Sequence, residues 1–382
     1  MKCLYRNWSK CTNTTSQEHV LPQALGGNIK SANPFAIRNI CSECNSLCGL
    51  YIDGPFIRSW FTQGDRARFA LRYIDINSKP VVPLTYMGIV QDLMYKDKIC
   101  EIWLGPTGDS IFHFHRPYPE EPDKEYTIGV PPHITRENID EGFTFLFVSS
   151  NNPVWHPVIF NSFVFHFNKS VNYLGNGLTP IGGGFRDIPD ELIKLKDILR
   201  ELMKDPIRAD FRINDGWGDR FLAKMALGIG KLVLKPEFQE SKSADLLRSF
   251  MWEKNIEKRK QLNMIHSGFL SNNNDSSDKH NELFSWPGGH FIAVIKTGIS
   301  ILLHMILYEK RSATIEISNE PNLLDCPVTS GFYYVIVPSL QRAVGPKKLH
   351  TYITHISGYK DKELENLEME MNKNMKLPPF KI

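Results

Sequence analysis

Glu18 and His19 are adjacent, so a carboxylate and an imidazole meet at the end of a short predicted strand. A carboxylate oxygen suits a hard cation such as Mg²⁺ or Mn²⁺, and an imidazole, with an ordinary pKa of about 6.5, accepts a proton at neutral pH. Hydrolysis of a phosphodiester needs an ion that stabilises charge on the phosphate oxygens and a base that deprotonates water. The pair therefore indicates phosphodiester hydrolysis as a candidate chemistry.

The elements around this pair must place it correctly. Gly26 and Gly27 turn the chain after the strand, and Ser42 is placed to cap a helix that carries Asn45 in its first turn. Free N–H groups at a helix start favour anions, so a phosphate near Asn45 would gain from that position. Neighbouring strand residues point to opposite faces, so Glu18 and His19 reach one phosphate only if the strand ends or bulges there.

The run Glu-His-Val-Leu-Pro-Gln-Ala-Leu-Gly-Gly, followed by Cys-Ser-Glu-Cys-Asn, resembles the HNH (ββα-metal) endonucleases over about residues 1–60. The resemblance implies that Glu18 and Asn45 ligate the catalytic divalent cation and that His19 is the general base. It also implies that Asn39 holds the loop and orients the histidine, with Asn33 as the weaker alternative. A ββα knuckle without catalytic activity is the other interpretation of the same residues.

The cysteines predict a structural zinc site, which needs four ligands in a tetrahedron. Two pairs from distant parts of the module would supply the thiolates: Cys3, Cys11, Cys41 and Cys44. The first pair departs from the usual tight knuckle, because Arg6 stands where its second cysteine is expected. Cys48, one helical turn after Cys44, is an alternative ligand, and a metal-free hairpin with buried thiols is the rival interpretation.

Charge is concentrated near the motif. The whole chain carries a net charge of +3, whereas residues 1–75 hold nine basic side chains against five acidic ones. Such a local excess favours contact with a phosphate backbone. The arginines expected to contact nucleic acid are Arg38, Arg58, Arg66 and Arg68. Because aromatic residues interleave with the last three, the segment 54–74 can equally be an amphipathic connector.

The bulk composition indicates an intracellular globular protein. A length of 382 residues predicts two or three domains, and 42% apolar with 23% charged residues is ordinary for such a chain. Seven cysteines without an evenly spread framework argue against a disulfide-stapled secreted protein. We find no signal peptide and no run of about 18 apolar residues, so a soluble, cytoplasmic protein without membrane contact is expected.

The remainder of the chain predicts mixed secondary structure. Apolar runs separated by turn residues predict strands at Val81–Met87, Ile99–Leu104, Ile111–His115, Phe143–Val148 and Val158–Phe167. Three- and four-residue spacing predicts helices at 189–206, 217–234 and 244–252, and an exposed terminal helix at 360–373. Further strands are expected at 290–296, 299–308, 313–317 and 332–337. His113 and His115 face the same side of their predicted strand, without a third ligand nearby.

These observations predict an α+β protein with an N-terminal ββα-metal (HNH) module at 1–75 and a larger mixed α+β region at 76–382, with a sub-boundary near 266–284. The resemblance implies a metal-dependent endonuclease that uses Mg²⁺ or Mn²⁺ and acts on DNA, with a role in restriction or phage defence. A homodimer, a regulatory ligand and a partner protein are expected associations. The alternative is a non-catalytic, zinc-stabilised protein that binds nucleic acid.

Overall fold

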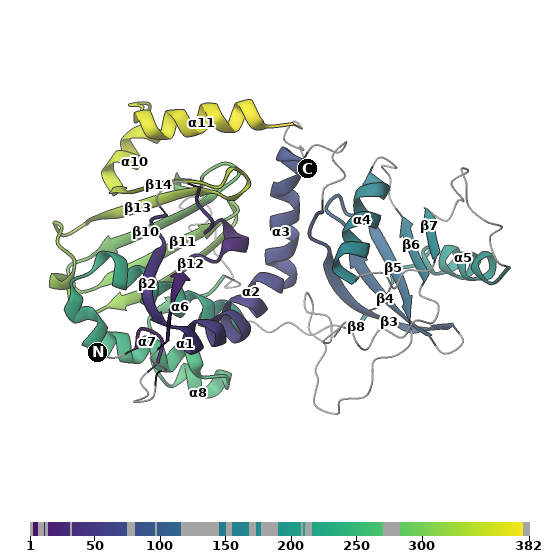
Figure 1. Ribbon diagram of the computed structural model, residues 1–382, viewed down its shortest axis with the longest axis horizontal. Coiled ribbons are helices and arrows are strands. Elements are labelled where there is room, and N and C mark those ends of the chain that lie inside the picture. Colours follow the sequence, from purple (N-terminus) through teal and green to yellow (C-terminus); the bar gives the residue numbers. More distant parts are fainter. Residues whose placement is uncertain are drawn as a thin grey trace. The chain divides into compact units, whose positions relative to one another are not determined.

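The computed structural model describes residues 3–6, 11, 14–30, 33–74, 81–95, 98–115, 145–149, 155–167, 173–176, 190–207, 209–210, 216–269 and 283–376 (Figure 1). The chain divides into two compact units. Unit 1 holds residues 1–57 and 215–375, and unit 2 holds residues 58–214 and 376–382. Unit 2 is thus inserted into unit 1, and the division differs from the predicted one, because residues 58–75 belong to unit 2 and the C-terminal sheet shares a unit with the N-terminal motif.

The N-terminal part of unit 1 is a ββα arrangement. Strands β1 (Thr15–His19) and β2 (Ala36–Cys41) pair antiparallel, with a register irregularity between Ser16 and Glu18. The 3₁₀ turn η1 (Gln23–Leu25) lies between the strands, and α1 (Ser42–Cys48) continues into the π-helical turn η2 (Gly49–Asp53) and α2 (Gly54–Arg58). A Cβ added at Gly27 would come 1.7 Å from the Leu21 carbonyl oxygen, so this turn requires glycine.

A six-stranded antiparallel sheet forms the centre of unit 1 (Figure 1). Its strand order is β14-β13-β10-β11-β12-β9. The strands are β9 (His266–Ser267), β10 (His290–Lys296), β11 (Ile301–Leu307), β12 (Arg311–Ser318), β13 (Ser330–Val337) and β14 (Arg342–Lys348). Short 3₁₀ turns accompany this region at η6 (Pro236–Glu240), η7 (Pro321–Leu323) and η8 (Pro338–Leu340).

Helices and the N-terminal motif cover this sheet. The helices are α6 (Gly216–Val233), α7 (Lys242–Trp252), α8 (Ile256–Lys260), α10 (Leu349–Ile356) and α11 (Lys362–Asn374). Helices α10 and α11 share a core with Tyr333 and Val335 of β13. On the same strand Tyr334 contacts Phe35 of the motif, with ring centroids 4.9 Å apart. Because strand residues alternate in direction, the motif and the terminal helices occupy opposite faces of β13.

Unit 2 contains a second six-stranded sheet, in the order β7-β6-β5-β4-β3-β8. All neighbours are antiparallel except β6 and β7. The strands are β3 (Thr85–Tyr95), β4 (Lys98–Leu104), β5 (Ser110–His115), β6 (Phe145–Ser149), β7 (Tyr173–Asn176) and β8 (Ala209–Asp210). The helices are α3 (Trp60–Ala70), α4 (His156–Phe167) and α5 (Asp190–Leu202), with the 3₁₀ turn η3 (Leu71–Tyr73).

Two separate hydrophobic cores lie on this second sheet. Helix α4 packs through Ile159 and Phe163 on Trp103, whereas α5 packs through Leu195 and Leu199 on the cluster that includes Val90, Cys100, Phe112 and Phe114. Neighbouring residues of β5, Ile111 and Phe112, belong to different clusters, so the two helices cover opposite faces.

The predicted α+β class is confirmed, and most long elements appear where periodicity predicted them. The helices predicted at 217–234 and 244–252 correspond to α6 and α7, and the hairpin predicted from 290 to 308 corresponds to β10 and β11. The predicted sub-boundary near 266–284 falls partly on residues 270–282, which lie outside the described residues, and the whole stretch 215–375 belongs to one unit.

Two predictions about the chain were wrong. The run Val158–Phe167, predicted as a strand, lies in helix α4, where Val158, Ile159, Ser162 and Phe163 are buried at helical spacing. An apolar run without clear alternation fits both periods, and packing on the sheet selects the helix. The terminal helix exists as α11 but is not simply exposed, because it buries three side chains against the sheet: Leu364, Leu367 and Met371.

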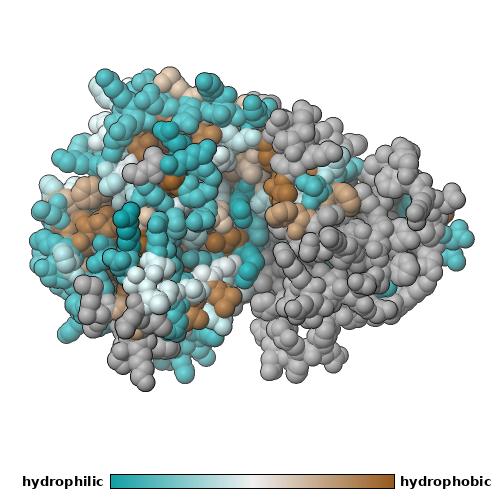
Figure 2. All heavy atoms as spheres, in the orientation of Figure 1, coloured by the Kyte–Doolittle hydropathy of each residue, from teal (hydrophilic) through white to brown (hydrophobic). Residues whose placement is uncertain are grey.

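The viewed surface of unit 1 is mainly polar, and the described helices do not meet the requirements for a membrane span. Figure 2 shows that hydrophilic side chains predominate on the viewed face of unit 1, with hydrophobic ones interspersed among them. Within the described ranges, every helix is too short or too polar to cross a bilayer.

Candidate active site and thiol cluster

His19 ends β1 and is held by its own turn. Its Nδ1 lies 3.0 Å from the Gly27 carbonyl oxygen and 3.2 Å from Asn33 Nδ2, and Asn33 Nδ2 also donates to the same carbonyl at 2.6 Å. Because a carbonyl can only accept, we assign the hydrogen to Nδ1, which donates to Gly27, while Asn33 Nδ2 donates to the same carbonyl and not to the ring. The lone pair of the neutral ring is therefore on Nε2, which is the nitrogen that can act as a base.

The base nitrogen faces a polar neighbour on a half-exposed surface. Gln23 Nε2 lies 3.3 Å from His19 Nε2 and can donate to it. The imidazole is half-buried, and Gln23 is exposed. A water molecule that replaced the amide of Gln23 would meet the lone pair directly, so the ring is both oriented and accessible.

Asn33, and not Asn39, provides the contact to the histidine. Asn33 Oδ1 accepts from the Phe35 backbone at 2.9 Å while its amide nitrogen faces His19. Asn39 is exposed on β2 and adopts a left-handed backbone conformation with φ of 62°. The orienting position that sequence analysis gave first to Asn39 is therefore occupied in space by the alternative residue.

Glu18 faces the interior of unit 1. Its exposed fraction is 3%, and its Oε1 accepts a hydrogen bond from the Tyr5 hydroxyl at 2.9 Å. The ammonium of Lys224, on α6, lies 2.7 Å from the same oxygen. The carboxylate thus has a positive partner within the chain and is buried, whereas the His19 imidazole is half-exposed.

Lys224 joins Glu18 to a second carboxylate, Asp53 in η2. The ammonium lies 3.2 Å from Asp53 Oδ2 and is fully buried. Burial alone would lower the pKa of Lys224, but Asp53 and Glu18 hold it above its ordinary value, so the side chain stays charged. Burial raises the pKa of Asp53 to about 6 against the opposing effect of Lys224. The side chain of Asp53 is only 15% exposed, so this carboxylate belongs to the buried cluster and not to the surface.

Asn45 lies in the first turn of α1 beside β1. Its Nδ2 donates to Ser16 Oγ and to the Gln17 carbonyl, each at 3.0 Å. These two bonds use the amide nitrogen and leave the amide oxygen to accept or to ligate. The residue is half-buried, so a ligand can reach it.

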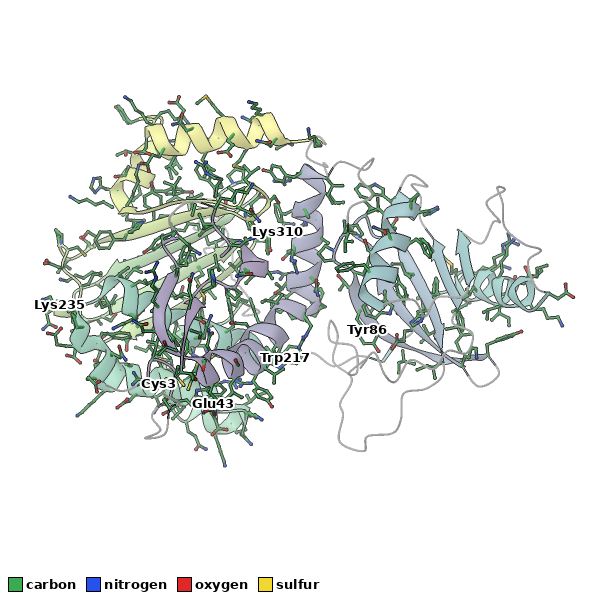
Figure 3. All side chains as sticks on the ribbon, in the orientation of Figure 1. Cys3, Glu43, Tyr86, Trp217, Lys235 and Lys310 are labelled. Carbon is green, nitrogen blue, oxygen red and sulfur yellow. The ribbon has the colours of Figure 1, made fainter. Side chains whose placement is uncertain are left out.

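The second cluster of the module consists of thiols. The sulfurs of Cys3, Cys11 and Cys44 lie within 4.8 Å of one another, and those of Cys11 and Cys44 are 3.7 Å apart. Among the described residues, no other group of three Cys, His, Asp or Glu side chains is gathered this closely. Figure 3 shows Cys3 beside the start of α1, near Glu43.

The thiol cluster fits a zinc ion. Four sulfurs about 2.3 Å from a tetrahedral zinc are separated by about 3.8 Å, which agrees with the 3.7 Å between Cys11 and Cys44. Three thiols, Cys3, Cys11 and Cys44, are gathered at these distances, and Cys41, which is buried at the end of β2 next to α1, is the candidate for the fourth ligand. Burial and hydrogen bonding to Cys3 raise the pKa of Cys11 to about 11, so a bound cation is needed to keep these groups as thiolates.

The departures from the usual zinc pattern have structural explanations. Arg6, at the position of the expected cysteine, forms an ion pair with Glu43 of α1 at 3.1 Å and lies 5.6 Å from the Trp252 ring centroid. Cys11 instead supplies the third sulfur of the cluster. Cys48, the alternative ligand, is fully buried, and burial raises the pKa of its thiol. It is not one of the three thiols that gather within 4.8 Å of one another.

The arginines predicted to contact nucleic acid are divided between the units. Arg38 is exposed on β2 in unit 1, whereas Arg58, Arg66 and Arg68 belong to unit 2. Arg68 pairs with Asp65 at 2.9 Å and lies 5.3 Å from the Phe69 ring centroid. These local contacts agree with the connector interpretation of the segment.

The ββα arrangement, the histidine held by its turn and the thiol cluster lie together in the N-terminal module. In a comparison with known families, residues 3–61 match the family described as HNH endonuclease. The predicted resemblance is thereby confirmed for the N-terminal module, which is an HNH-type nuclease domain and implies a nucleic acid as partner. No curated protein and no solved structure matches the chain.

Sequence reasoning missed Lys224, which lies 205 residues after His19. The available signal was a single lysine within the apolar run of α6, between Ala223 and Met225. A lone lysine on a buried helix face needs a carboxylate partner, but the sequence does not say which one.

Proposed function

We propose that unit 1 is an HNH endonuclease that hydrolyses phosphodiester bonds, with His19 as the general base. The observation that carries the proposal is the arrangement around the imidazole: Gly27 accepts from Nδ1, and Nε2 keeps its lone pair on an accessible face. This arrangement occurs within residues that match the HNH endonuclease family. A fixed tautomer with the free nitrogen outward is what general-base catalysis requires.

In the proposed reaction, Nε2 of His19 takes a proton from a water molecule that attacks the phosphorus. Asn33 and the Gly27 carbonyl keep the ring in place while it becomes charged, because Nδ1 already donates to that carbonyl. The carbonyl dipole then stabilises the imidazolium that forms. As the new bond between the water oxygen and phosphorus forms, the bond to the 3′ oxygen breaks. The 3′ oxygen takes a proton from solvent to become a hydroxyl, and the His19 imidazolium returns its proton to solvent.

The residues expected to hold the catalytic divalent cation fit unequally. HNH domains bind divalent metals, so dependence on Mg²⁺ or Mn²⁺ belongs to the proposal. When bound, such an ion stabilises negative charge on the phosphate oxygens. Asn45 fits as a ligand, because its amide oxygen is left available. Glu18 does not fit in this arrangement, because its carboxylate is buried and paired with Lys224.

DNA is the proposed substrate, and the family resemblance supports this choice. One HNH site cuts one strand, so a break in both strands requires a homodimer or two successive encounters. A role in restriction or phage defence also rests on the resemblance. Plating of phage on cells that carry the wild-type chain or its His19→Ala variant tests that role, and equal plaque numbers would contradict it.

The central experiment compares the wild-type chain with His19→Ala on supercoiled plasmid in Mg²⁺, in Mn²⁺ and in EDTA. We expect nicking that requires the metal and that falls roughly a hundredfold to ten-thousandfold in the variant, the usual contribution of a general base. His350, exposed on α10, provides the matched control, and His350→Ala should cut like the wild type.

One observation favours a second candidate function. The pairing of Glu18 with Lys224 buries the residue that was expected to ligate the catalytic cation. A module without that ligand could bind nucleic acid, stabilised by zinc, without cutting it. Plasmid that is shifted on a gel but remains intact in both metals would support this binder and reject the nuclease.

A further inference from the structure

Lys224 of α6 makes four polar contacts with the N-terminal module. Its ammonium lies 2.7 Å from Glu18 Oε1 and 3.2 Å from Asp53 Oδ2. It also donates to the carbonyl oxygens of Val20, at 2.8 Å, and of His19, at 3.3 Å. Three N–H groups thus serve four oxygens, two of which belong to the backbone that carries the base.

The backbone contacts are placed where β1 ends. His19 is the last residue of the strand, and Val20 begins the turn to η1. A carbonyl at a strand end has no partner in the ladder and needs one from elsewhere when it is buried. The ammonium provides this partner for both carbonyls and so fixes the direction in which the chain leaves the strand.

The same helix touches the same turn at a second point, one helical turn further on. A Cβ added at Gly228 would come 2.4 Å from Cγ1 of Val20, so α6 lies directly against the residue that follows the base. This packing does not depend on charge. It shows that α6 positions the His19 turn by shape as well as by hydrogen bonds.

The charges explain why a lysine is tolerated in this interior. An ammonium buried without a counter-ion would be strongly destabilising, whereas two carboxylates within reach compensate it. The Tyr5 hydroxyl donates to Glu18 at 2.9 Å and holds that carboxylate in place. Glu18 therefore acts on Lys224 as a counter-ion, and this role explains its burial better than ligation of a metal does.

We propose that Lys224 is a positioning residue of the nuclease site, which ties the strand end beneath His19 to α6, and that Glu18 serves it as a counter-ion. The inference rests on the proposed function, because a positioned base presupposes a reaction. It also assigns the C-terminal part of the chain a direct part in that reaction. The substrate itself never touches Lys224, because the side chain is fully buried.

The test measures plasmid nicking by Lys224→Met, Glu18→Gln and the double variant, with kcat, KM for DNA and the half-saturating Mn²⁺ concentration for each. We expect a roughly hundredfold loss of kcat in Lys224→Met with both other quantities unchanged, since a small misplacement of a catalytic group costs about this much. Lys231→Met, on the same helix but away from the cluster, should cut like the wild type.

The double variant shows whether the two side chains act as a unit. If they do, Glu18→Gln with Lys224→Met has about the same kcat as either single variant, because one broken pair is broken only once. Losses that multiply would overturn the inference. A Glu18→Gln variant that recovers its activity at high Mn²⁺ would also overturn it, because that behaviour identifies a metal ligand.

Zinc content and melting temperature show whether each variant is folded. If Lys224→Met does not fold, Lys224→Arg keeps the charge with altered geometry, and a roughly tenfold loss of kcat at unchanged KM is expected. Wild-type kcat in a folded Lys224→Met or in Lys224→Arg would overturn the inference alone. A His19→Ala variant as active as the wild type would overturn the proposed function, and the positioning role would fall with it.

Discussion

The two clusters of the N-terminal module differ in where their positive charge comes from. The thiols of Cys3, Cys11 and Cys44 converge at distances that suit a cation from outside the chain. The carboxylates of Glu18 and Asp53 instead meet the ammonium of Lys224, which the chain itself supplies. The difference teaches that residues of similar metal-binding chemistry, a few positions apart in one motif, need not share a metal-binding role.

The comparison also distinguishes local from long-range assembly. All residues of the thiol cluster lie within the first 44 positions, so the module supplies every one of its ligands. The charged cluster needs α6, which follows after the inserted unit 2. One cluster is therefore a property of the motif, and the other is a property of the whole of unit 1.

Loss of the metal from the thiol cluster is expected to have the largest effect on stability. A chain that carries no zinc would contradict the difference drawn between the two clusters. The purified chain should carry about one zinc per molecule by mass spectrometry, and Cys44→Ser should lose it. In a structural site, zinc binding energy on the order of 10 kcal/mol becomes folding energy, so the variant should lose most of its stability to urea.

Cys326, half-buried in unit 1 and remote from the cluster in sequence, provides the control for this experiment. Cys326→Ser should retain both the zinc and the stability of the wild type. Zinc retained at full occupancy in Cys44→Ser would show that these thiols are not its ligands and that both clusters are metal-free.

His290 sharpens the comparison, because it is a buried ionisable group that belongs neither to the thiol cluster nor to the charged cluster around Lys224. Its Nδ1 accepts from the Tyr308 backbone at 3.1 Å, and burial lowers its pKa to about 3. The unfolded chain takes up this proton near pH 6.5 and the folded chain does not. Stability should therefore be complete above pH 6.5 and fall by up to about 1.4 kcal/mol per pH unit as the pH decreases towards 3.

Urea unfolding of the wild type and of His290→Gln at pH 7 and pH 5 measures this contribution. The variant keeps an acceptor for Tyr308 but has no group that titrates in this range. Its stability should therefore decrease less between the two pH values than that of the wild type. Equal decreases would mean that His290 is not held neutral by burial.

Arg6 is expected to have the smallest effect. Its ion pair with Glu43 is partly solvent-exposed, and its guanidinium lies near the Trp252 ring, so Arg6→Ala should cost about 1 kcal/mol. Arg6→Lys should recover little of this loss, because lysine lacks the planar group that stacks. Loss of zinc in Arg6→Ala would contradict the separation of this residue from the thiol cluster.

Much of this architecture was predictable from local patterns. Leu195 and Leu199 at four-residue spacing predicted α5, and two apolar runs on either side of Thr297 and Gly298 predicted the strands β10 and β11. The Val158–Phe167 run failed, because its apolar character does not distinguish a strand from a helix buried on a sheet. The motif residues could be predicted because they lie next to or near one another in the sequence, as Glu18 and His19 do.

The site was less predictable than the motif. Asn33 and Asn39 both precede the cysteine pair, and only the turn geometry brings Asn33 to the histidine. The partnership of Glu18 with Lys224 depends on how α6 packs, which no local pattern encodes. Asp53 joins the same cluster, and no local pattern reveals the helix whose lysine pairs with it.

Because unit 2 is inserted between two parts of unit 1, it determines which segments recombination can exchange without separating residues that act together. A recombination that transferred only residues 1–75 would carry His19 and the cysteines but not Lys224, which bonds to the backbone at His19. The described residues of the stretch 58–214, by contrast, supply no side chain to either cluster, and this stretch is the natural segment for exchange.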